Sequence, residues 1–256
     1  MESYTKSMEE LGYEIRLPEE ARDLTIQEEF FLFIQNGKER KLRIHDYGEI
    51  YPVPYLFEHL MNKLQAKSHT VVPSLLIEQV TKSGNMAEDL AVLEIGAGSG
   101  MLGKALADLG VKSIVGIDIL PEAAEAAKRQ YPGVYEDYYA EDLTHLSKAA
   151  QEGLNSREFN CIVCGTALGF NHIPSSAWAT AFNQIAANSW VAFNVQKERW
   201  EDKGSASFMK WHPWVAETDV FEIVHTQDFQ HRFHVDGRSV NYVAIIGIKK
   251  GDILRS

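Results

Sequence analysis

Short apolar runs alternate with longer amphipathic segments along most of this chain. The runs have the length of strands, and the segments between them repeat their apolar residues with a helical period. Seven strands are predicted, at Leu90–Ile95, Ser113–Ile117, Val134–Tyr139, Phe159–Gly165, Trp190–Val195, Val220–Phe233 and Ser239–Lys249. Because strands that alternate with helices form parallel sheets, the pattern predicts an α/β fold with helices on both faces. The last two runs are joined through Asp236-Gly237 and are expected to be an antiparallel pair.

The first 82 residues follow a different pattern. Residues 1–25 are charged and weakly patterned, which predicts a loosely docked start with Ala21–Asp23 in a short helix. An Asn36-Gly37 step lies between two β-rich runs and predicts a hairpin over about residues 29–46. Helices are expected over about residues 56–82, at Phe57–Lys67 and Pro73–Lys82. We therefore expect an N-terminal extension and cap over residues 1–82 and a core over residues 83–256.

A glycine-rich turn joins the first core strand to a helix, Met101–Leu109. The turn reads Glu94-x-Gly96-x-Gly98-x-Gly100, and Asp118 ends the next strand, 22 positions after Gly96. Glycines let the backbone approach a ligand, and the following helix directs its free N–H groups to the same place. A carboxylate at the end of the second strand suits the hydroxyls of a ribose. A dinucleotide fingerprint would instead have the spacing G-x-G-x-x-G.

This spacing resembles motif I of the class I S-adenosylmethionine (SAM) methyltransferases. The resemblance runs from about residue 90 to residue 250 and implies a Rossmann-like sheet of seven strands with the last one antiparallel. Residues 98–119, 161–174 and 190–202 are similar to the small-molecule subgroup named for the Williams–Beuren region methyltransferase-like protein, and residues 43–61 resemble extensions of some microbial members. The resemblance implies SAM as the cofactor, with contacts at Glu94, Gly96, Ala97, Gly98, Gly100, Asp118, Ile119, Asp142, Leu143 and Gly165.

Two further acids and a loop complete the expected site. Glu94 is placed to organise the ammonium group of SAM, directly or through water. Asp142 is a candidate for the adenine amino group, and its alternative role is to cap a helix that begins near Leu143. In the loop after the fourth strand, His172 is the candidate base and Asn171 is a candidate to orient the acceptor. The alternative for His172 is a surface or packing residue.

Aromatic residues flank the expected pocket on both sides. Tyr47, Tyr51 and Tyr55 are spaced by four in a proline-punctuated segment, which suits a lid over SAM and substrate. Trp211 belongs to an aromatic helical segment after the fifth strand and borders the same pocket. The alternative for each of these residues is ordinary core packing.

Composition narrows the function classes. The net charge of −11 and pI near 5.3 repel a nucleic-acid backbone, so we expect no nucleic-acid partner. No run of eighteen apolar residues and no signal segment is evident, which indicates a cytoplasmic protein without a membrane partner. Cys161 and Cys164 lie at an odd offset in a strand and are expected to be core residues on opposite faces. No metal-ligand constellation is recognisable.

The sequence thus predicts a SAM-dependent methyltransferase that acts on O or N of a small organic acceptor, such as a secondary metabolite. Two alternatives stay open: a cyclase or pericyclase of methyltransferase fold that uses SAM non-reactively, and a non-catalytic SAM-binding partner protein. The sequence identifies neither the acceptor nor the oligomeric state.

Overall fold

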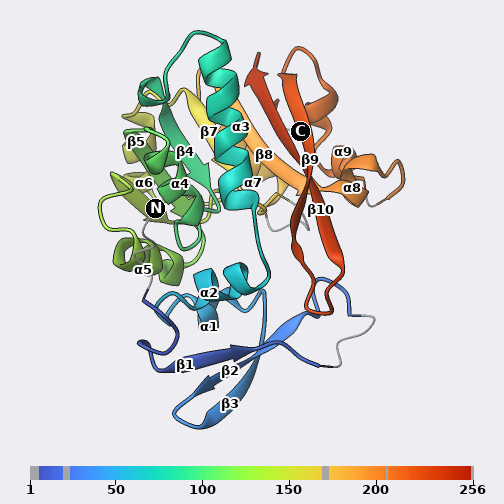
Figure 1. Cartoon of the computed structure of the whole chain (residues 1–256). Coiled ribbons are helices and arrows are strands. Elements are labelled where there is room, and N and C mark those ends of the chain that lie inside the picture. Colours follow the sequence, from blue (N-terminus) through green and yellow to red (C-terminus); the bar gives the residue numbers. More distant parts are fainter. Residues whose placement is uncertain (1–5, 20–23, 169–172, 206, 255–256) are drawn as a thin grey trace.

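The computed structural model describes residues 6–19, 24–168, 173–205 and 207–254, which form a large core sheet and a smaller N-terminal sheet (Figure 1). The core sheet has the strand order β6-β5-β4-β7-β8-β10-β9. Its strands are β4 (Ala91–Ile95), β5 (Ser113–Asp118), β6 (Asp137–Ala140), β7 (Cys161–Cys164), β8 (Trp190–Gln196), β9 (Phe221–Phe233) and β10 (Ser239–Lys249). Only β10 runs antiparallel to its neighbours, β8 and β9, while β4 to β8 pair in parallel. The predicted Rossmann-like fold is confirmed.

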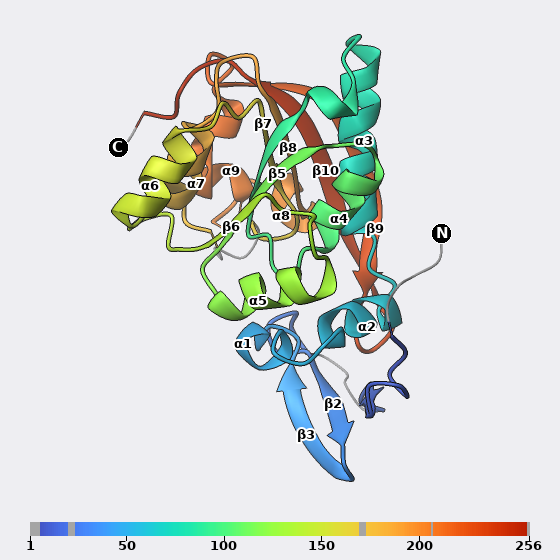
Figure 2. The same cartoon turned by 90° about the vertical axis from the view of Figure 1, so that its left-hand side faces the viewer.

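Helices cover both faces of the core sheet (Figure 2). They are α3 (Ser68–Lys82), α4 (Met101–Asp108), α5 (Pro121–Gln130), α6 (Lys148–Asn155), α7 (Ser175–Phe182), α8 (Lys197–Glu201) and α9 (Phe208–Trp211), with 3₁₀ turns at Ala87–Asp89 and Pro213–Ala216. One apolar cluster joins α3 and α4 to the sheet, and a second joins α6, α7 and α9 to it. Cys161 belongs to the first cluster and Cys164 to the second, so the two buried thiols lie on opposite faces as expected.

The N-terminal sheet contains one strand that the sequence pattern does not predict. The expected hairpin is present as β2 (Phe30–Gln35) and β3 (Lys38–Arg43), with positive φ at Asn36 and Gly37. In addition, β1 (Tyr13–Arg16) pairs with β2. The expectation of a loosely docked start is wrong for these four residues, because a strand this short is stabilised by non-local pairing and by burial of its alternate side chains. The helix expected at Ala21–Asp23 lies outside the described residues.

Three helices lead from this sheet to the core. They are α1 (Tyr47–Ile50), α2 (Leu56–Lys63) and α3, which begins five residues before the predicted start and contains Pro73 in its interior. Proline removes one backbone donor from a helix, which costs stability. Here the cost is offset because Val72, Leu76 and Val80 are fully buried on the same helix. No helix in the described part of the chain is both long and apolar enough to cross a membrane.

A buried ion pair fastens the N-terminal extension to the far end of the core. Glu29, just before β2, has no exposed surface and pairs with Arg232 of β9, which is 4% exposed. One Arg232 N–H donates to Glu29 Oε1 over 2.9 Å, and the Val235 N–H donates to the same oxygen over 2.9 Å. Figure 1 shows the β9–β10 hairpin reaching out of the core to the N-terminal sheet. This pair therefore holds the extension against the ends of the core strands.

We predict that Glu29→Ala lowers the free energy of unfolding by about 3–5 kcal/mol, because it leaves the Arg232 guanidinium buried without its carboxylate. Chemical denaturation measures the change. Arg40→Ala is the matched control, since it breaks the exposed Arg40–Glu49 pair and should leave the unfolding midpoint in place. Equal effects of the two variants would show that the buried pair does not hold the extension.

Candidate active site

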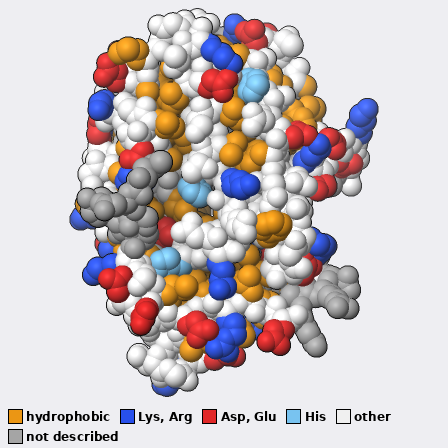
Figure 3. All heavy atoms as spheres, in the orientation of Figure 1, with side chains coloured by type: hydrophobic (Ala, Val, Ile, Leu, Met, Phe, Trp, Pro, Cys, Tyr) orange, Lys and Arg blue, Asp and Glu red, His pale blue; other side chains and the backbone are white. Residues whose placement is uncertain are grey.

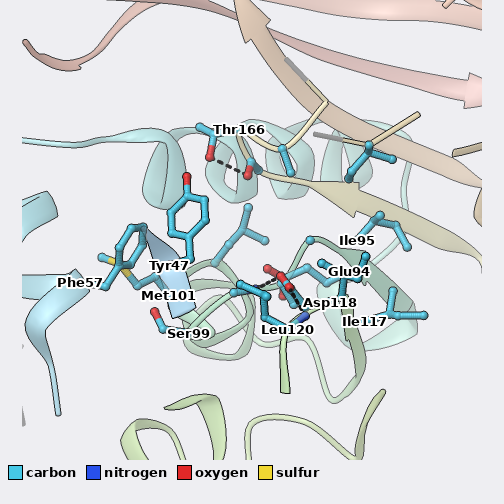
Figure 4. Close-up of a pocket in the computed structure, with 18 of the residues that line it drawn as sticks. Tyr47, Phe57, Glu94, Ile95, Ser99, Met101, Ile117, Asp118, Leu120 and Thr166 are labelled. Atoms are coloured by element: carbon cyan, nitrogen blue, oxygen red, sulfur yellow. Dashed lines mark hydrogen bonds between the residues drawn. The ribbon is translucent and has the colours of Figure 1, made fainter. Parts of the chain in front are cut away.

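A pocket of about 450 Å³ lies between the carboxyl ends of the core strands and the N-terminal extension (Figure 4). Parallel α/β sheets bind ligands at this edge. Its acidic side chains, Glu94, Asp118, Glu141 and Asp142, lie on the side of β4, β5 and β6, which we call the acidic half. The other side, the cap half, is lined by His45, Tyr47, Phe57, Met61, Ala66, Ser68, His69, Met101, Thr166 and His231.

The glycine-rich turn is fixed against the end of β5. The N–H groups of Gly96 and Ala97 both donate to the carbonyl oxygen of Ile117, over 2.9 and 3.1 Å. Gly98 has φ +55, and its N–H donates to Asp118 Oδ2 over 3.0 Å. The Leu120 N–H donates to Asp118 Oδ1 over 3.0 Å. The Asp118 carboxylate is therefore clamped between two loops by backbone donors, at the lining of the pocket.

Both carboxyl groups of the strand ends have raised pKa values. Burial raises the pKa of Asp118 more than the backbone donors lower it. Glu94 is 2% exposed, and burial together with the charge of Asp118 raises its pKa to about 8, although Tyr135 donates a 2.8 Å hydrogen bond to Glu94 Oε2. Without a cation nearby, Glu94 is therefore mostly protonated at pH 7.

The N-terminal extension is attached directly to the glycine-rich turn. Ser99 Oγ donates to Glu58 Oε1 of α2 over 2.6 Å, and Arg129 donates to the carbonyl oxygen of Tyr51 over 2.7 Å. The Tyr51 hydroxyl lies 2.7 Å from the position that a Cβ on Gly98 would occupy. Tyr47 stacks on Tyr51, with ring centroids 5.5 Å apart and an angle of 12° between the planes. A change in the position of these extension residues would therefore shift the glycine-rich turn.

Most of the predicted cofactor residues line this pocket. Of the ten, Gly100 is the exception, because it lies beneath the turn and packs against Tyr131 and Tyr135. Of the predicted lid and substrate residues, Tyr47 and Tyr51 line the pocket, whereas Tyr55 and Trp211 lie outside its described lining. Asn171 and His172 lie outside the described residues.

The region around Asp142 differs from the helix expected there. Asp142 Oδ1 accepts hydrogen bonds from the N–H and the hydroxyl of Thr144, over 2.8 and 2.7 Å, and these bonds lower its pKa. The residues after it form a turn, and α6 begins only at Lys148, with Ser147 as its cap. The prediction of a helix start near Leu143 is wrong. An aspartate whose side chain bonds to the backbone two residues later favours a turn as readily as a helix start. The Ile119 side chain, next to Asp118, is 65% exposed at the pocket.

Sequence reasoning missed the histidines of the cap half. His69 stands at the start of α3, His231 is in β9 and His45 precedes α1, and all three line the pocket. For His231, the sequence offered one signal, which was a histidine inside a predicted strand. Local periodicity could not reveal that these three segments meet.

The described residues contain no cluster of three or more side chains that could hold a metal ion. Burial raises the pKa of Cys164 to about 12, and also raises that of Cys161. Neither thiol is a nucleophile at neutral pH.

We predict that Gly98→Ala lowers the free energy of unfolding by about 1–3 kcal/mol more than Gly133→Ala does. Both glycines have positive φ, but an added Cβ meets the Tyr51 hydroxyl at Gly98 and nothing within 4 Å at Gly133. Adding Tyr51→Phe to Gly98→Ala should restore part of the loss. Denaturation curves of the wild type and these three variants measure this, and a Gly98→Ala cost no larger than that of Gly133→Ala would contradict the packing.

Comparisons with known proteins agree with this geometry. Residues 92–188 match the family model described as a methyltransferase domain. The magnesium protoporphyrin IX methyltransferase from Synechocystis PCC 6803, solved with bound SAM, is 17% identical; the match covers 71% of this chain and 80% of that one, with a TM-score of 0.50. An N-methyltransferase from Bradyrhizobium japonicum WM9, solved with S-adenosyl-L-homocysteine, is also 17% identical, over 68% of this chain and 84% of that one, with a TM-score of 0.47.

None of the curated proteins matches the chain. At 17% identity the Synechocystis structure shows the fold alone. Residues 92–188 of this chain thus match a methyltransferase domain model, and its core sheet has the Rossmann-like methyltransferase fold.

Proposed function

We propose that this chain binds SAM in the pocket and transfers its methyl group to O or N of a small organic acceptor. The observation that supports this proposal most strongly is the pocket itself. It joins an acidic half, at the glycine-rich turn and the strand ends, to a cap half without acidic or basic side chains other than histidine. We also propose that the chain is related to the small-molecule subgroup named for the Williams–Beuren region methyltransferase-like protein, which its sequence resembles.

The residues of the acidic half fit SAM. Asp118 presents a carboxylate of fixed orientation at the pocket, which suits the ribose hydroxyls. Glu94 is a buried carboxyl without a cation, which suits the ammonium group. The exposed apolar side chain of Ile119 and the buried Leu143 suit the two faces of an adenine ring, and Asp142 suits its amino group. When bound, SAM supplies a methyl group that is electrophilic because it is attached to a sulfonium.

Three features support a small acceptor rather than a macromolecule. The N-terminal extension covers the cap half, with Tyr47, Phe57 and Met61 in the pocket lining. The volume lies within the roughly 300–1,000 Å³ of small-molecule sites. The net charge of −11 opposes association with a nucleic-acid backbone.

Asp118→Asn should weaken SAM binding by about tenfold or more, because the amide keeps the shape but removes the charge and one acceptor oxygen. Calorimetry with SAM measures the change. Asp108→Asn is the control, since Asp108 lies on α4 and pairs only with Lys104 at the surface.

The wild-type protein is also assayed for turnover with SAM and a panel of small hydroxyl and amine acceptors. Formation of S-adenosylhomocysteine together with a methylated product supports the proposal. Turnover without gain of a methyl group would favour a cyclase, and SAM binding without any turnover would favour a non-catalytic partner. No SAM affinity at all would refute the proposal.

SAM binding near pH 7 should release protons from Glu94. The pKa of about 8 means that this carboxyl is mostly protonated at pH 7, and a nearby ammonium would lower the pKa. The wild type should release on the order of one proton more than Glu94→Gln at pH 7, and the difference should vanish above pH 9.

Calorimetry in two buffers of different ionisation enthalpy measures this proton release. The exposed Glu125→Gln variant is the control and should behave as the wild type. Equal proton release by wild type and Glu94→Gln at pH 7 would contradict the assignment of Glu94 to the ammonium group.

A further inference from the structure

A chain of hydrogen bonds runs beneath the cap half and ends on a histidine. The Thr166 N–H donates to Asn194 Oδ1 over 2.6 Å, and Asn194 Nδ2 donates to Ser68 Oγ over 2.6 Å. Ser68 Oγ lies 2.6 Å from His231 Nδ1. Asn194 has no exposed surface and Ser68 is 4% exposed, so bulk water does not compete for these bonds. The chain links the loop after β7 to β8, α3 and β9.

The first member of this chain fixes the orientation of Asn194. A backbone N–H only donates, so the Asn194 oxygen must face Thr166 and the Asn194 amide must donate to Ser68. Ser68 accepts this bond and keeps its single hydroxyl proton, which we assign to the 2.6 Å hydrogen bond with His231 Nδ1. A neutral imidazole that accepts at Nδ1 carries its proton on Nε2. Burial holds the pKa of His231 well below its ordinary value, so the ring is neutral at pH 7.

The backbone of β9 also singles out His231. Val240 pairs with Arg232 and Asn241 pairs with Gln230, which leaves His231 as the extra residue of a β-bulge. Bulges re-aim a side chain beside active sites. The His231 carbonyl oxygen accepts from the Lys67 N–H over 2.7 Å, which fixes the residue to the start of α3. His231 lines the pocket and is thus held there as a hydrogen-bond donor.

His69 is the second histidine of this group. It follows Ser68 in α3, lines the pocket, and its charge would act on His231. No hydrogen bond joins the His69 ring to another side chain or to the backbone within the described part of the protein. Burial lowers its pKa, so a nitrogen lone pair is available at neutral pH. His69 is therefore able to accept a proton from a ligand to which His231 donates a hydrogen bond.

The rest of the cap half is uncharged. Phe57, Met61, Ala66 and Met101 form apolar walls, and no lysine or arginine among the described residues lines any part of the pocket. The acidic residues lie in the other half. Figure 3 shows histidine and hydrophobic side chains at the surface where the core and the N-terminal extension meet. An ionised substrate would find no counter-charge here and would have to give up its hydration.

We propose that the acceptor is an uncharged aromatic or enolic hydroxyl compound with an oxygen next to the hydroxyl. His69 accepts the hydroxyl proton, and His231 Nε2–H donates to the neighbouring oxygen. His69 is then the catalytic base, and Ser68 and Asn194 are positioning residues for His231. This inference rests on the proposed function and names the substrate class for the same site.

The step balances in atoms and charge. The acceptor O–H bond breaks and its proton moves to the free nitrogen of His69. The acceptor oxygen uses the electron pair to form a bond to the methyl carbon, while the electrons of the carbon–sulfur bond go to sulfur. His69 later returns the proton to water, so the ring is neutral for the next cycle.

Three matched probes test the substrate class by fluorescence titration of the protein loaded with S-adenosylhomocysteine. They are methyl 3-hydroxy-2-naphthoate, its free carboxylate 3-hydroxy-2-naphthoate, and methyl 2-naphthoate, which lacks the hydroxyl. We expect the hydroxy ester to bind at least about tenfold more tightly than either of the others. His231→Phe should remove most of this preference, whereas His225→Gln, on the same strand but outside the pocket lining, should not. Tighter binding of the carboxylate would overturn the inference.

Turnover of the hydroxy ester with SAM tests the base. His69→Gln should lower kcat by about 10²-fold or more while SAM affinity stays as in the wild type. In the wild type, kcat should fall as the pH drops through the pKa of His69, which burial lowers from its ordinary value. This decrease of kcat at low pH should be absent in His69→Gln. Around His69, the other titratable groups that line the pocket among the described residues are His45, Tyr47 and Tyr51 in and beside α1, His231 on β9, and Glu94, Asp118, Glu141 and Asp142 in the acidic half.

Ser68→Ala tests the positioning role independently of activity. Ring ¹⁵N spectra should show His231 protonated at Nε2 in the wild type and as a mixture of tautomers in the variant. An unchanged kcat and pH profile in His69→Gln, or no methyl ether from the hydroxy ester although SAM binds, would overturn the inference and leave the proposed function standing. Loss of SAM binding in the wild type would instead refute the proposed function itself.

Discussion

The buried pair of Glu29 and Arg232 is the interaction on which the pocket depends. The two residues are 203 positions apart, and their contact joins the extension to the core on the far side of the pocket from the Ser99–Glu58 bond. Since a buried charge without its partner is costly, the pair favours one docking of the extension over all others. The same contact determines where His231 lies, because that residue immediately precedes Arg232 in the bulge of β9. Attachment of the cap and the position of the histidine are therefore coupled through neighbouring residues of β9.

Local sequence patterns were enough for the core and for its acidic half. The turn from Glu94 to Gly100 and the acid at Asp118 lie within one βαβ unit, where spacing along the chain sets position in space. Strand β10 was predicted with its observed bounds, since turn residues and apolar alternation mark both of its ends.

The cap half could not be predicted in the same way. Ser68, Thr166, Asn194 and His231 come from four separate elements, and only the folded chain brings them within hydrogen-bond distance. Strand β1 was missed for the same physical reason, because its partner β2 lies on the other side of a long connection. Pro73 misled the prediction of α3, since burial of the surrounding side chains outweighed the missing backbone donor.

Burial acts in opposite directions on the two halves of the pocket. It raises the pKa values of the carboxyl groups at Glu94 and Asp118 and lowers those of the histidines at positions 69 and 231. Both shifts reduce the charge of the ligand-free pocket. A cation that enters the acidic half reverses the shift only there, because the carboxyl groups can ionise against it while the histidines stay neutral. The charge of a bound sulfonium nucleoside would thus be matched on one side, and an uncharged proton acceptor would remain on the other, which is the distribution that transfer of a methyl group to a neutral hydroxyl requires.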